Sequence, residues 1–405
     1  MSLKKLGSNA AAAVAGALVG ALVVLAAEGA TRDLPPSTRS PVSIPSPTHE
    51  LEVKQPSRLG PRRTVLLAWS PGGIPPGTER ALERLPSVVS ATTIRAGLDW
   101  IESSTTTDGA MLDRPPAGQA IPFEVAIVEP TEYADYVAPS EREAILALEP
   151  GNAVMAQTAS EIRGAGAGLR LKLRGGRVTV TDVVSDATTQ GYEALLAGDV
   201  PDTWERTDRF VLIRVNHRSA QRAVSSLIRE RLEPGRVLRI RAQGETPFLR
   251  YGDAVLSQLL VKATFGEFSA EPRRDGTITT QTAWRAKNIV AREVPILGEV
   301  TCHRGLFPQL EQAMQEAADA GLAFTIDPDD FGGCYGPRFI DSNPGGRLSH
   351  HSWGIAIDFN VAQNRPGTPP DLDRRFVRIM ESNGFTWGGR WLIPDGMHFE
   401  WVRFP

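Results

Sequence analysis

The sequence predicts an α+β protein of two globular domains, preceded by an export segment and a proline-rich linker. The 405 residues, 41% hydrophobic and 22% charged, have ordinary globular composition and are long enough for two domains. Short apolar, β-branched stretches are interspersed with amphipathic ones, which indicates both strands and helices. The formal net charge of −3, with both signs mixed, gives no reason to expect a nucleic-acid partner.

The first 32 residues have the pattern of a targeting segment. Lys4 and Lys5 precede an apolar run over residues 10–27, and Glu28 and Arg32 follow it. Because the lysines come before the run, we expect the N-terminus on the cytoplasmic side of the membrane and the rest of the chain on the outer side. The length of the run suits either a cleaved signal peptide or a short membrane anchor. Both alternatives predict an extracytoplasmic protein, secreted or membrane-anchored.

Residues 33–63 are expected to form a linker. Many of the 31 prolines of the chain fall in this stretch, among serine, threonine and glutamate. Such a composition cannot form a packed core and is typical of an extended tether. His49 lies within it, and we expect this histidine to be solvated and without function.

Residues 64–289 are expected to form an α+β domain with two similar strand–helix–strand units. Their spacing predicts a pseudo-repeated, ferredoxin-like arrangement, although the identity between the copies is too low to prove duplication. The predicted elements of the two units are strand 64–69, helix 75–85 and strand 88–94, then strand 209–215, helix 219–232 and strand 236–242.

The stretch between these units adds a strand over 123–128, a helix over 140–148 and a hairpin of 169–173 with 177–180. It contains no catalytic arrangement, and His217 is expected to be a surface or capping residue. The domain resembles extracytoplasmic domains of permease-type membrane proteins, without a specific motif. Binding, positioning or regulation are its expected roles, and its protein partner is unknown.

The C-terminal domain is expected over residues 290–405. A helix is predicted from Phe307 to Gly321, because glycine commonly ends helices and the apolar residues before it share one face. These apolar residues are Leu310, Ala313, Met314 and Ala317.

The only two cysteines, Cys302 and Cys334, flank this helix. Outside the cytoplasm, two cysteines in one domain are expected to form a disulfide, here stabilising by roughly 3–4 kcal/mol in the chain-entropy model. A zinc-thiolate site is the alternative. His303, beside Cys302, is expected to be structural and not a metal ligand.

Two histidines and two carboxylates near the C-terminus have the composition of a hydrolytic zinc site. Such a site takes three ligands from His, Asp or Glu, leaves a fourth position for water, and has a carboxylate nearby to accept the water's proton. His351, Asp358 and His398 are the candidate ligands, and Asp395 is the candidate base.

Two ligands of one ion place a geometrical demand on the segment between His351 and Asp358. In a straight strand these residues would lie roughly 23 Å apart, which is too far. The chain must therefore bend, and we expect the bend at Gly354. A helix would also bring the two onto one face, but residues 355–360 alternate as in a strand.

Three motifs stand together in the C-terminal domain: Ser349-x-His351-x-x-Gly354-x-Ala356-x-Asp358, Asp395-x-x-His398 and Cys334-Tyr335-Gly336-Pro337-Arg338. With these motifs, residues 290–405 resemble the zinc D-Ala-D-Ala carboxypeptidases and L-alanyl-D-glutamate endopeptidases, the VanY-like or M15 peptidases. The resemblance implies a Hedgehog/DD-peptidase-like fold, Zn²⁺ bound by His351, Asp358 and His398, and a general base at 395. It also implies that Arg338 steadies substrate or oxyanion charge.

Neighbouring residues compete for two of these roles. His351, and not His350, lies seven residues before Asp358, so His350 is assigned to the rim or to support of the ligands. Asp395 stands where some relatives have Glu, and the shorter side chain must be carried closer by its backbone. Glu400 is the competing base, because it shares a strand face with His398.

The expected function is zinc-assisted amide hydrolysis in peptidoglycan stem peptides or cross-bridges of the bacterial cell envelope. The sequence does not distinguish a carboxypeptidase from an endopeptidase. Ser349 and Trp353 are expected to border the substrate, and Trp387, Trp391 and Trp401 are expected either to form walls or to pack in the core. There are two alternatives. In the first, the C-terminal domain is a zinc-stabilised binding module with little catalysis, and the domain 64–289 carries the main role. In the second, the catalytic site is complete but is inhibited by residues 64–289.

Overall fold

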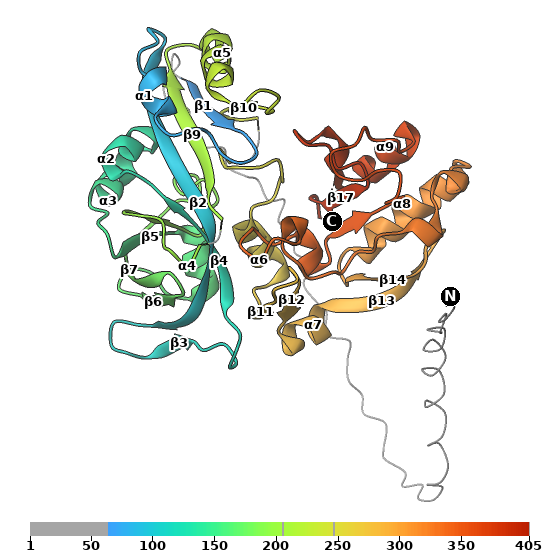
Figure 1. The fold of residues 1–405 in the computed structure, drawn as a ribbon. Coiled ribbons are helices and arrows are strands. Elements are labelled where there is room, and N and C mark those ends of the chain that lie inside the picture. Colours follow the sequence, from blue (N-terminus) through green and yellow to red (C-terminus); the bar gives the residue numbers. More distant parts are fainter. Residues whose placement is uncertain (1–63, 205, 246–247, 405) are drawn as a thin grey trace, which may run out of the picture. The chain divides into compact units, whose positions relative to one another are not determined.

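The computed structural model describes residues 64–204, 206–245 and 248–404 (Figure 1). The expected export segment 1–32, with its anchor over residues 10–27, and the linker 33–63 with His49 lie outside these residues. Within the described ranges, no helix combines the length and the apolar character needed to cross a membrane.

Helices and strands are mixed along the whole described chain, which confirms the α+β class. The helices are α1 (Thr78–Leu82), α2 (Pro130–Tyr133), α3 (Arg142–Leu146), α4 (Gln157–Arg163), α5 (Gln221–Arg231), α6 (Gln258–Phe265), α7 (Thr282–Asn288), α8 (Phe307–Asp319) and α9 (Arg374–Ser382). The strands are β1 (Thr64–Trp69), β2 (Val88–Thr105), β3 (Met111–Asp113), β4 (Ile121–Ile127), β5 (Asn152–Ala156), β6 (Arg170–Leu173), β7 (Gly176–Val184), β8 (Ala194–Leu196), β9 (Asp208–Val215), β10 (Arg239–Ala242), β11 (Ala270–Pro272), β12 (Ile278–Thr280), β13 (Ile289–Val294), β14 (Gly298–His303), β15 (Ala356–Asp358), β16 (Phe385–Trp387) and β17 (His398–Trp401).

The two predicted strand–helix–strand units interlock in one sheet. Strands β10, β1, β9 and β2 are neighbours in this order, and all three pairings are antiparallel. Each unit's two strands are therefore separated by one strand of the other unit, as in a split β–α–β arrangement. This order agrees with the ferredoxin-like expectation, and the proposed duplication stays a prediction.

Strand β2 is much longer than the 88–94 stretch that the sequence predicts, because it continues to Thr105. Its first half pairs with β9, and its second half pairs with both β4 and β6. These pairings close β2, β4, β8, β5, β7 and β6 into a ring, whose interior holds a separate apolar cluster. The predicted hairpin of residues 169–180 forms two adjacent strands of this ring, β6 and β7.

Helix α6 belongs to two apolar cores at once. Leu259 packs in the core of the strand ring, whereas Leu260, Val261 and Phe265 pack in the core that surrounds the C-terminal elements. Trp100 of β2 lies in that second core as well, 6.2 Å from the ring of Phe339. The C-terminal core thus takes residues from well before position 290, while the domain boundary at 289/290 stays a prediction.

The C-terminal elements comprise the β13–β14 hairpin, helices α8 and α9, and the three-stranded sheet β15–β17–β16 (Figure 1). Helix α8 covers most of the range that the sequence predicts, and Gly321 follows it with φ 68°. Its predicted apolar face is fully buried, and consists of Leu310, Ala313, Met314 and Ala317.

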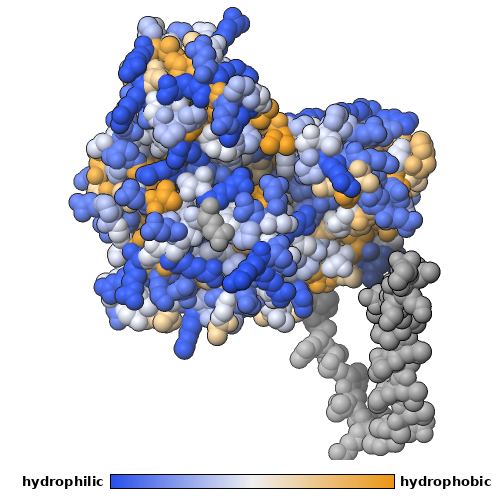
Figure 2. Space-filling model, viewed as in Figure 1, coloured by the Kyte–Doolittle hydropathy of each residue, from blue (hydrophilic) through white to orange (hydrophobic). Residues whose placement is uncertain are grey.

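The surface in Figure 2 is mainly hydrophilic, with apolar residues in small separate groups. The large exposed apolar residues among those described include Met111 in β3, Leu146 in α3 and Phe324. Because they come from different elements, they have the pattern of ordinary surface residues.

Candidate metal centre

Strands β15 and β17 place Asp358 and His398 directly opposite each other. The two strands pair antiparallel, with Asp358 facing His398 and Ile357 facing Phe399. Because side chains alternate along a strand, Asp358 and His398 share one face while Ile357 and Phe399 fill the core on the other. A pair forty residues apart in sequence thereby becomes a cross-strand pair.

His351 reaches this face from a tight turn. Residues His350–Trp353 form a 3₁₀ turn, and the Ser349 side chain accepts a hydrogen bond from the His351 N–H at 3.4 Å. Gly354 follows with φ 67°, in the left-handed region, and strand β15 begins two residues later. The predicted bend at Gly354 is therefore confirmed, and the helical alternative for residues 351–358 is wrong.

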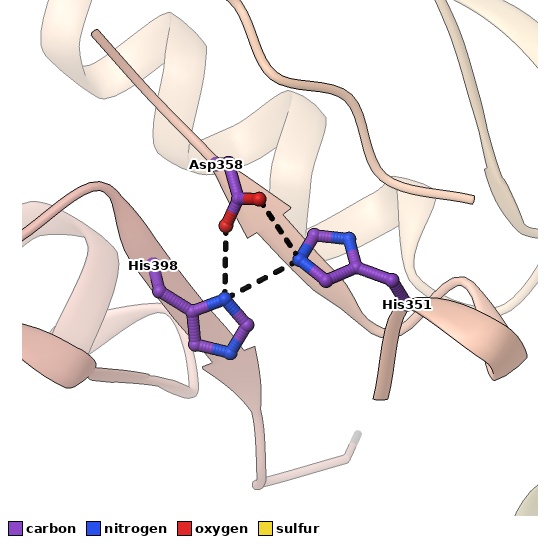
Figure 3. Close-up of side chains that lie close together, drawn as sticks. All are labelled: His351, Asp358 and His398. Carbon is purple, nitrogen blue, oxygen red and sulfur yellow. Dashed lines mark hydrogen bonds and ion pairs between the residues drawn. The ribbon is translucent and has the colours of Figure 1, made fainter. Parts of the chain in front are cut away.

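The three candidate ligands converge on one point (Figure 3). His351 Nε2 lies 3.1 Å from Asp358 Oδ2, His398 Nδ1 lies 2.9 Å from Asp358 Oδ1, and the two ring nitrogens are 3.3 Å apart. Ligand atoms roughly 2.0–2.1 Å from a tetrahedral, zinc-sized ion lie about 3.3 Å from one another. The donor set therefore fits such an ion.

The ring of His351 is held in the orientation that a metal ligand needs. Its Nδ1–H donates to the Cys334 carbonyl at 2.8 Å, so Nε2 keeps its lone pair on the side of the cluster. On the other ring, His398 Nε2 faces Glu400 Oε1 at 3.6 Å. In each imidazole, one ring nitrogen thus faces an oxygen atom, and the other ring nitrogen faces the cluster, where it can bind a cation.

Buried negative charge surrounds the two rings. Burial alone would raise the pKa of Asp358, but His351 and His398 beside it outweigh this and hold the pKa well below its ordinary range. Glu400 is buried as well, and His350 and His398 likewise lower its pKa. Burial opposes a charge on His398, yet Asp358 and Glu400 raise its pKa to about 10. The cluster therefore attracts positive charge, which a metal ion supplies.

Asp395 lines the same cavity of about 210 Å³ as the three ligands. Burial, together with the charges of Asp358 and Asp341, raises the pKa of Asp395 to about 6, although His398 and Arg338 oppose the shift. Its Oδ1 has no hydrogen-bond partner among the described residues. This carboxylate can therefore gain and lose a proton near neutral pH.

Arg338 is placed beside the cluster, with Nη2 3.3 Å from Asp358 Oδ2 and Nη1 donating to the Gly336 carbonyl at 3.2 Å. About a third of its side chain is exposed, at 33%. The hydroxyl of Ser352 fixes its backbone, because it accepts from the Arg338 N–H and donates to the Arg338 carbonyl, both at 3.1 Å. Arg338 therefore borders the cavity from a held position.

The tryptophans divide between the cavity and the core. Trp391 lines the cavity, with its ring centroid 5.1 Å from that of His398. Trp387 and Trp401 are buried and pack against Phe399 and Phe265, respectively. Trp353 and Ser349 both line the cavity, but Trp353 is 1% exposed and its indole N–H donates to the Gly266 carbonyl. Contact of Ser349 or Trp353 with substrate stays a prediction.

The remaining histidines and the cysteines lie outside the ligand cluster. His350 Nδ1 is 2.9 Å from Glu400 Oε1, so His350 supports the carboxylate behind His398. His303 is buried against the Phe265 ring, and His217 is exposed and contacts Ser219. Cys302 and Cys334 form a disulfide, so the thiolate alternative is wrong.

Three cavity residues could not be identified from the C-terminal motifs. The cavity that contains the metal cluster is also lined by Glu124 in β4, by Arg250, and by Gln258, the first residue of α6. They precede His351 by about a hundred residues or more, and each is a polar residue without any motif around it. Their buried polar character in apolar elements was the only available signal.

One of the comparisons with known proteins bears on this site, the match to a family model. No curated protein matches the chain. Among solved structures, the chain is similar to the periplasmic region of MacB from Actinobacillus actinomycetemcomitans, at 9% sequence identity and a TM-score of 0.28. The similarity covers 44% of this chain and 88% of the MacB chain. The family model described as D-alanyl-D-alanine carboxypeptidase matches residues 342–401, the segment that carries His351, Asp358, Asp395 and His398. This match supports the resemblance to that family that the motifs indicate, over residues 342–401.

Proposed function

We propose that the protein is a zinc metallopeptidase that hydrolyses amide bonds in peptidoglycan peptides outside the cytoplasm. The observation that carries this proposal is the convergence of His351, Asp358 and His398, with ligand atoms within 4.8 Å of one another, in a cavity that Asp395 also lines. The family match over these residues supports a peptidase.

His351 Nε2, Asp358 and His398 Nδ1 would hold the ion. When bound, Zn²⁺ supplies Lewis-acid polarisation of the scissile carbonyl and lowers the pKa of water toward neutrality. The protein's own groups do the rest. Asp395 accepts a proton from the attacking water and returns it to the departing amine nitrogen. Arg338 donates its guanidinium N–H groups to the carbonyl oxygen as negative charge develops there.

Between the two candidate bases, the geometry favours Asp395. A general base works best when its pKa lies near the operating pH and its oxygen is free. Each carboxylate has one oxygen without a partner among the described residues, Oδ1 of Asp395 and Oε2 of Glu400, but only Asp395 has a pKa raised to about 6. Glu400 has a lowered pKa and lies against His350 and His398. We therefore assign Glu400 to holding these two rings.

The substrate class follows from the family and from the expected export of the chain. Stem peptides or cross-bridges of peptidoglycan are the proposed substrates, and both a D,D-carboxypeptidase and an L,D-type endopeptidase fit the site. Arg338 suits either activity, because a guanidinium binds a terminal carboxylate or an internal D-glutamate carboxylate in the same way.

The test is digestion of purified muropeptides by the full-length, zinc-loaded protein, with products identified by mass spectrometry. Cleavage that is abolished by a chelator and restored by zinc is expected, and Asp395→Asn should slow it by about 10²-fold or more. Glu299→Gln, on an exposed position of β14, is the matched control and should cleave like the parent. If the zinc-loaded parent cleaves no muropeptide, or if Asp395→Asn cleaves as fast as the parent, the proposed mechanism is wrong and a zinc-stabilised binding module becomes the better account.

A further inference from the structure

One wall of the cavity comes from a part of the chain that the family model does not cover. Glu124, Arg250, Leu256 and Gln258 line the same cavity as the metal cluster, whereas the family match begins at residue 342. These residues are buried, with Gln258 only 5% exposed. A polar wall of this kind has to be explained, because buried polar groups normally have partners.

Gln258 is held in a single orientation. Its side-chain Nε2 donates to Glu193 Oε1 at 2.9 Å. Glu193 in turn is bound by Lys262 Nζ at 2.7 Å, and both of these side chains are fully buried. Because a carboxylate that is bound in this way only accepts, the amide N of Gln258 must face Glu193 and its Oε1 must face away.

The Oε1 of Gln258 has no hydrogen-bond partner among the described residues. The other cavity-lining residues with such atoms lie on the C-terminal motifs: Asp395 Oδ1 and Glu400 Oε2 are acceptors, and His350 Nδ1 lies 2.9 Å from Glu400 Oε1. Of the arginines that line the cavity, Arg250 is paired with Glu124 and the Gly191 carbonyl, and Arg347 with Asp208 and the Tyr251 carbonyl. Arg338 lies against Asp358 on the side of the metal cluster and is already assigned to the substrate's oxygen. The unused hydrogen-bonding capacity on this wall is therefore that of an acceptor, so its ligand must bring N–H donors.

We infer that Gln258 Oε1 is a substrate-binding acceptor that receives an N–H of the peptide, so that residues before 290 form part of the substrate site. This inference rests on the proposed peptidase function and adds the subsite to it. Two sources offer this chemistry, a main-chain amide N–H and the side-chain ammonium of a diamino residue in the stem. Asp395 and Glu400 have other tasks, so Gln258 is the neutral acceptor available for binding.

The test measures peptide binding by isothermal titration calorimetry. The full-length, zinc-loaded protein carries Asp395→Asn to prevent turnover, and the ligand is a lysine-containing stem pentapeptide with either a free or an acetylated side-chain amine. Gln258→Met, which fills the same space without an acceptor, is expected to raise the Kd about 5–20-fold. Gln258→Glu is the matched control. A carboxyl group buried against Glu193 keeps its proton, because two carboxylates in contact cannot both ionise, so it donates to Glu193 in place of the amide and keeps a carbonyl oxygen. It should bind no more than about threefold more weakly than the parent.

The two peptides distinguish the donors. If Gln258 receives the ammonium, acetylation weakens binding to the parent, and Gln258→Met removes the difference between the peptides. If it receives a main-chain N–H, Gln258→Met weakens the binding of both peptides equally.

Three outcomes overturn the inference. The first is equal peptide binding by the parent and Gln258→Met, the second is an equal loss of binding in Gln258→Met and Gln258→Glu, and the third is the absence of peptide binding to the parent. If Gln258→Met does not fold, Gln258→Ala, which also lacks the acceptor, replaces it with the same expected rise in the Kd. Cleavage of muropeptides by the parent is measured separately, so failure of this subsite is distinguishable from failure of the proposed function.

Discussion

Gly354 is the residue on which the position of His351 depends most. Its φ of 67° is in the region that favours glycine, and a Cβ built on it would lie 2.7 Å from the backbone nitrogen of His303. The His303 N–H also donates to the Gly354 carbonyl at 2.9 Å. The turn that carries His351 is thus pressed against strand β14, with no room for a side chain.

Gly354→Ala should therefore destabilise the protein by about 2–4 kcal/mol, from left-handed strain and from displacement of the β14 backbone. Gly321→Ala is the matched control, because Gly321 has a φ of 68° but no atom within 4 Å of the added Cβ. The control should lose only about 1 kcal/mol. Urea unfolding of the two variants measures both values. Equal losses would show that the contact with β14 adds nothing to the strain.

His303 gives the protein a pH-dependent stability. Burial, with a smaller contribution from the charge of Arg304, lowers the pKa of His303 to about 4 from 6.5. Between these values the unfolded chain binds a proton that the folded protein does not, so stability is complete above pH 6.5 and decreases as the pH falls toward 4. The expected loss from this group is about 2 kcal/mol at pH 5.

Urea unfolding at pH 7.5 and pH 5 tests this expectation by difference. His303→Gln keeps an acceptor for the Gly305 N–H, which donates to Nδ1 in the parent at 3.2 Å, but has no charge to gain. The parent should therefore lose about 2 kcal/mol more than the variant between the two pH values. A difference below about 0.5 kcal/mol would contradict the prediction.

At the scale of elements, the disulfide and the metal cluster are linked through Cys334. This residue is bonded to Cys302 of β14, and its carbonyl accepts the His351 Nδ1–H. The sequence alone predicted the disulfide, but a carbonyl acceptor leaves no mark on the sequence. Loss of the disulfide is therefore expected to affect both stability and metal binding.

The double variant Cys302→Ala, Cys334→Ala should lose about 3–4 kcal/mol of stability in the chain-entropy model. Its zinc affinity should fall by about tenfold or more, because the group that orients a ligand ring is less firmly held. Unfolding by urea and competition with a chromogenic chelator measure the two effects. Unchanged zinc affinity in the folded double variant would show that the Cys334 carbonyl is held without the disulfide.

The loop that carries Trp391 is fastened by a residue far from it in sequence. Asp253 Oδ2 accepts from the Leu392 N–H at 2.7 Å, and Asp253 Oδ1 lies 3.3 Å from Arg241 Nη2. Trp391, next in the chain to Leu392, packs on His398. Asp253 is therefore a positioning residue for the wall over the metal cluster.

Asp253→Ala should raise the KM for muropeptide cleavage about 3–10-fold, since one buried hydrogen bond is lost, while kcat stays within about twofold. Asp253→Asn keeps an oxygen for the Leu392 N–H and should restore most of the KM. Steady-state kinetics of the full-length protein test both variants. A fall in kcat with unchanged KM would place the role of Asp253 elsewhere.

At the scale of the molecule, the C-terminal core is completed by residues that precede position 290. Phe265 and Phe268 pack on Trp401 and Trp353 at ring-centroid distances of 5.4 and 4.7 Å. We therefore predict that a fragment of residues 290–405 alone does not fold cooperatively, because it exposes apolar surface that α6 normally covers. A fragment of residues 64–405 should unfold in one cooperative transition. Circular dichroism during heating compares the two, and a sharp transition in the shorter fragment would refute the prediction.

The sequence predicted the metal cluster better than its surroundings. The spacing of His351, Asp358 and His398 and the bend at Gly354 follow from local chemistry, and each recurs in the structure. The strands of the two interlocking units also had clear β-branched patterns. By contrast, the closure of β2 on β6 and the contribution of Gln258 to the cavity depend on contacts between residues far apart in sequence. Such contacts are set by packing, and neither periodicity nor spacing encodes them.

The pairing of Asp358 with His398 across β15 and β17 has a consequence for how this protein can diversify. The separation of these two ligands is fixed by strand register, so the exposed loop of residues 365–369 between them can change in length without moving either one. Insertions there would reshape the rim of the cavity while the metal chemistry stays constant. An insertion of one residue within β17 would instead turn His398 toward the core. The fold thus separates a loop whose length can change from strands whose register cannot.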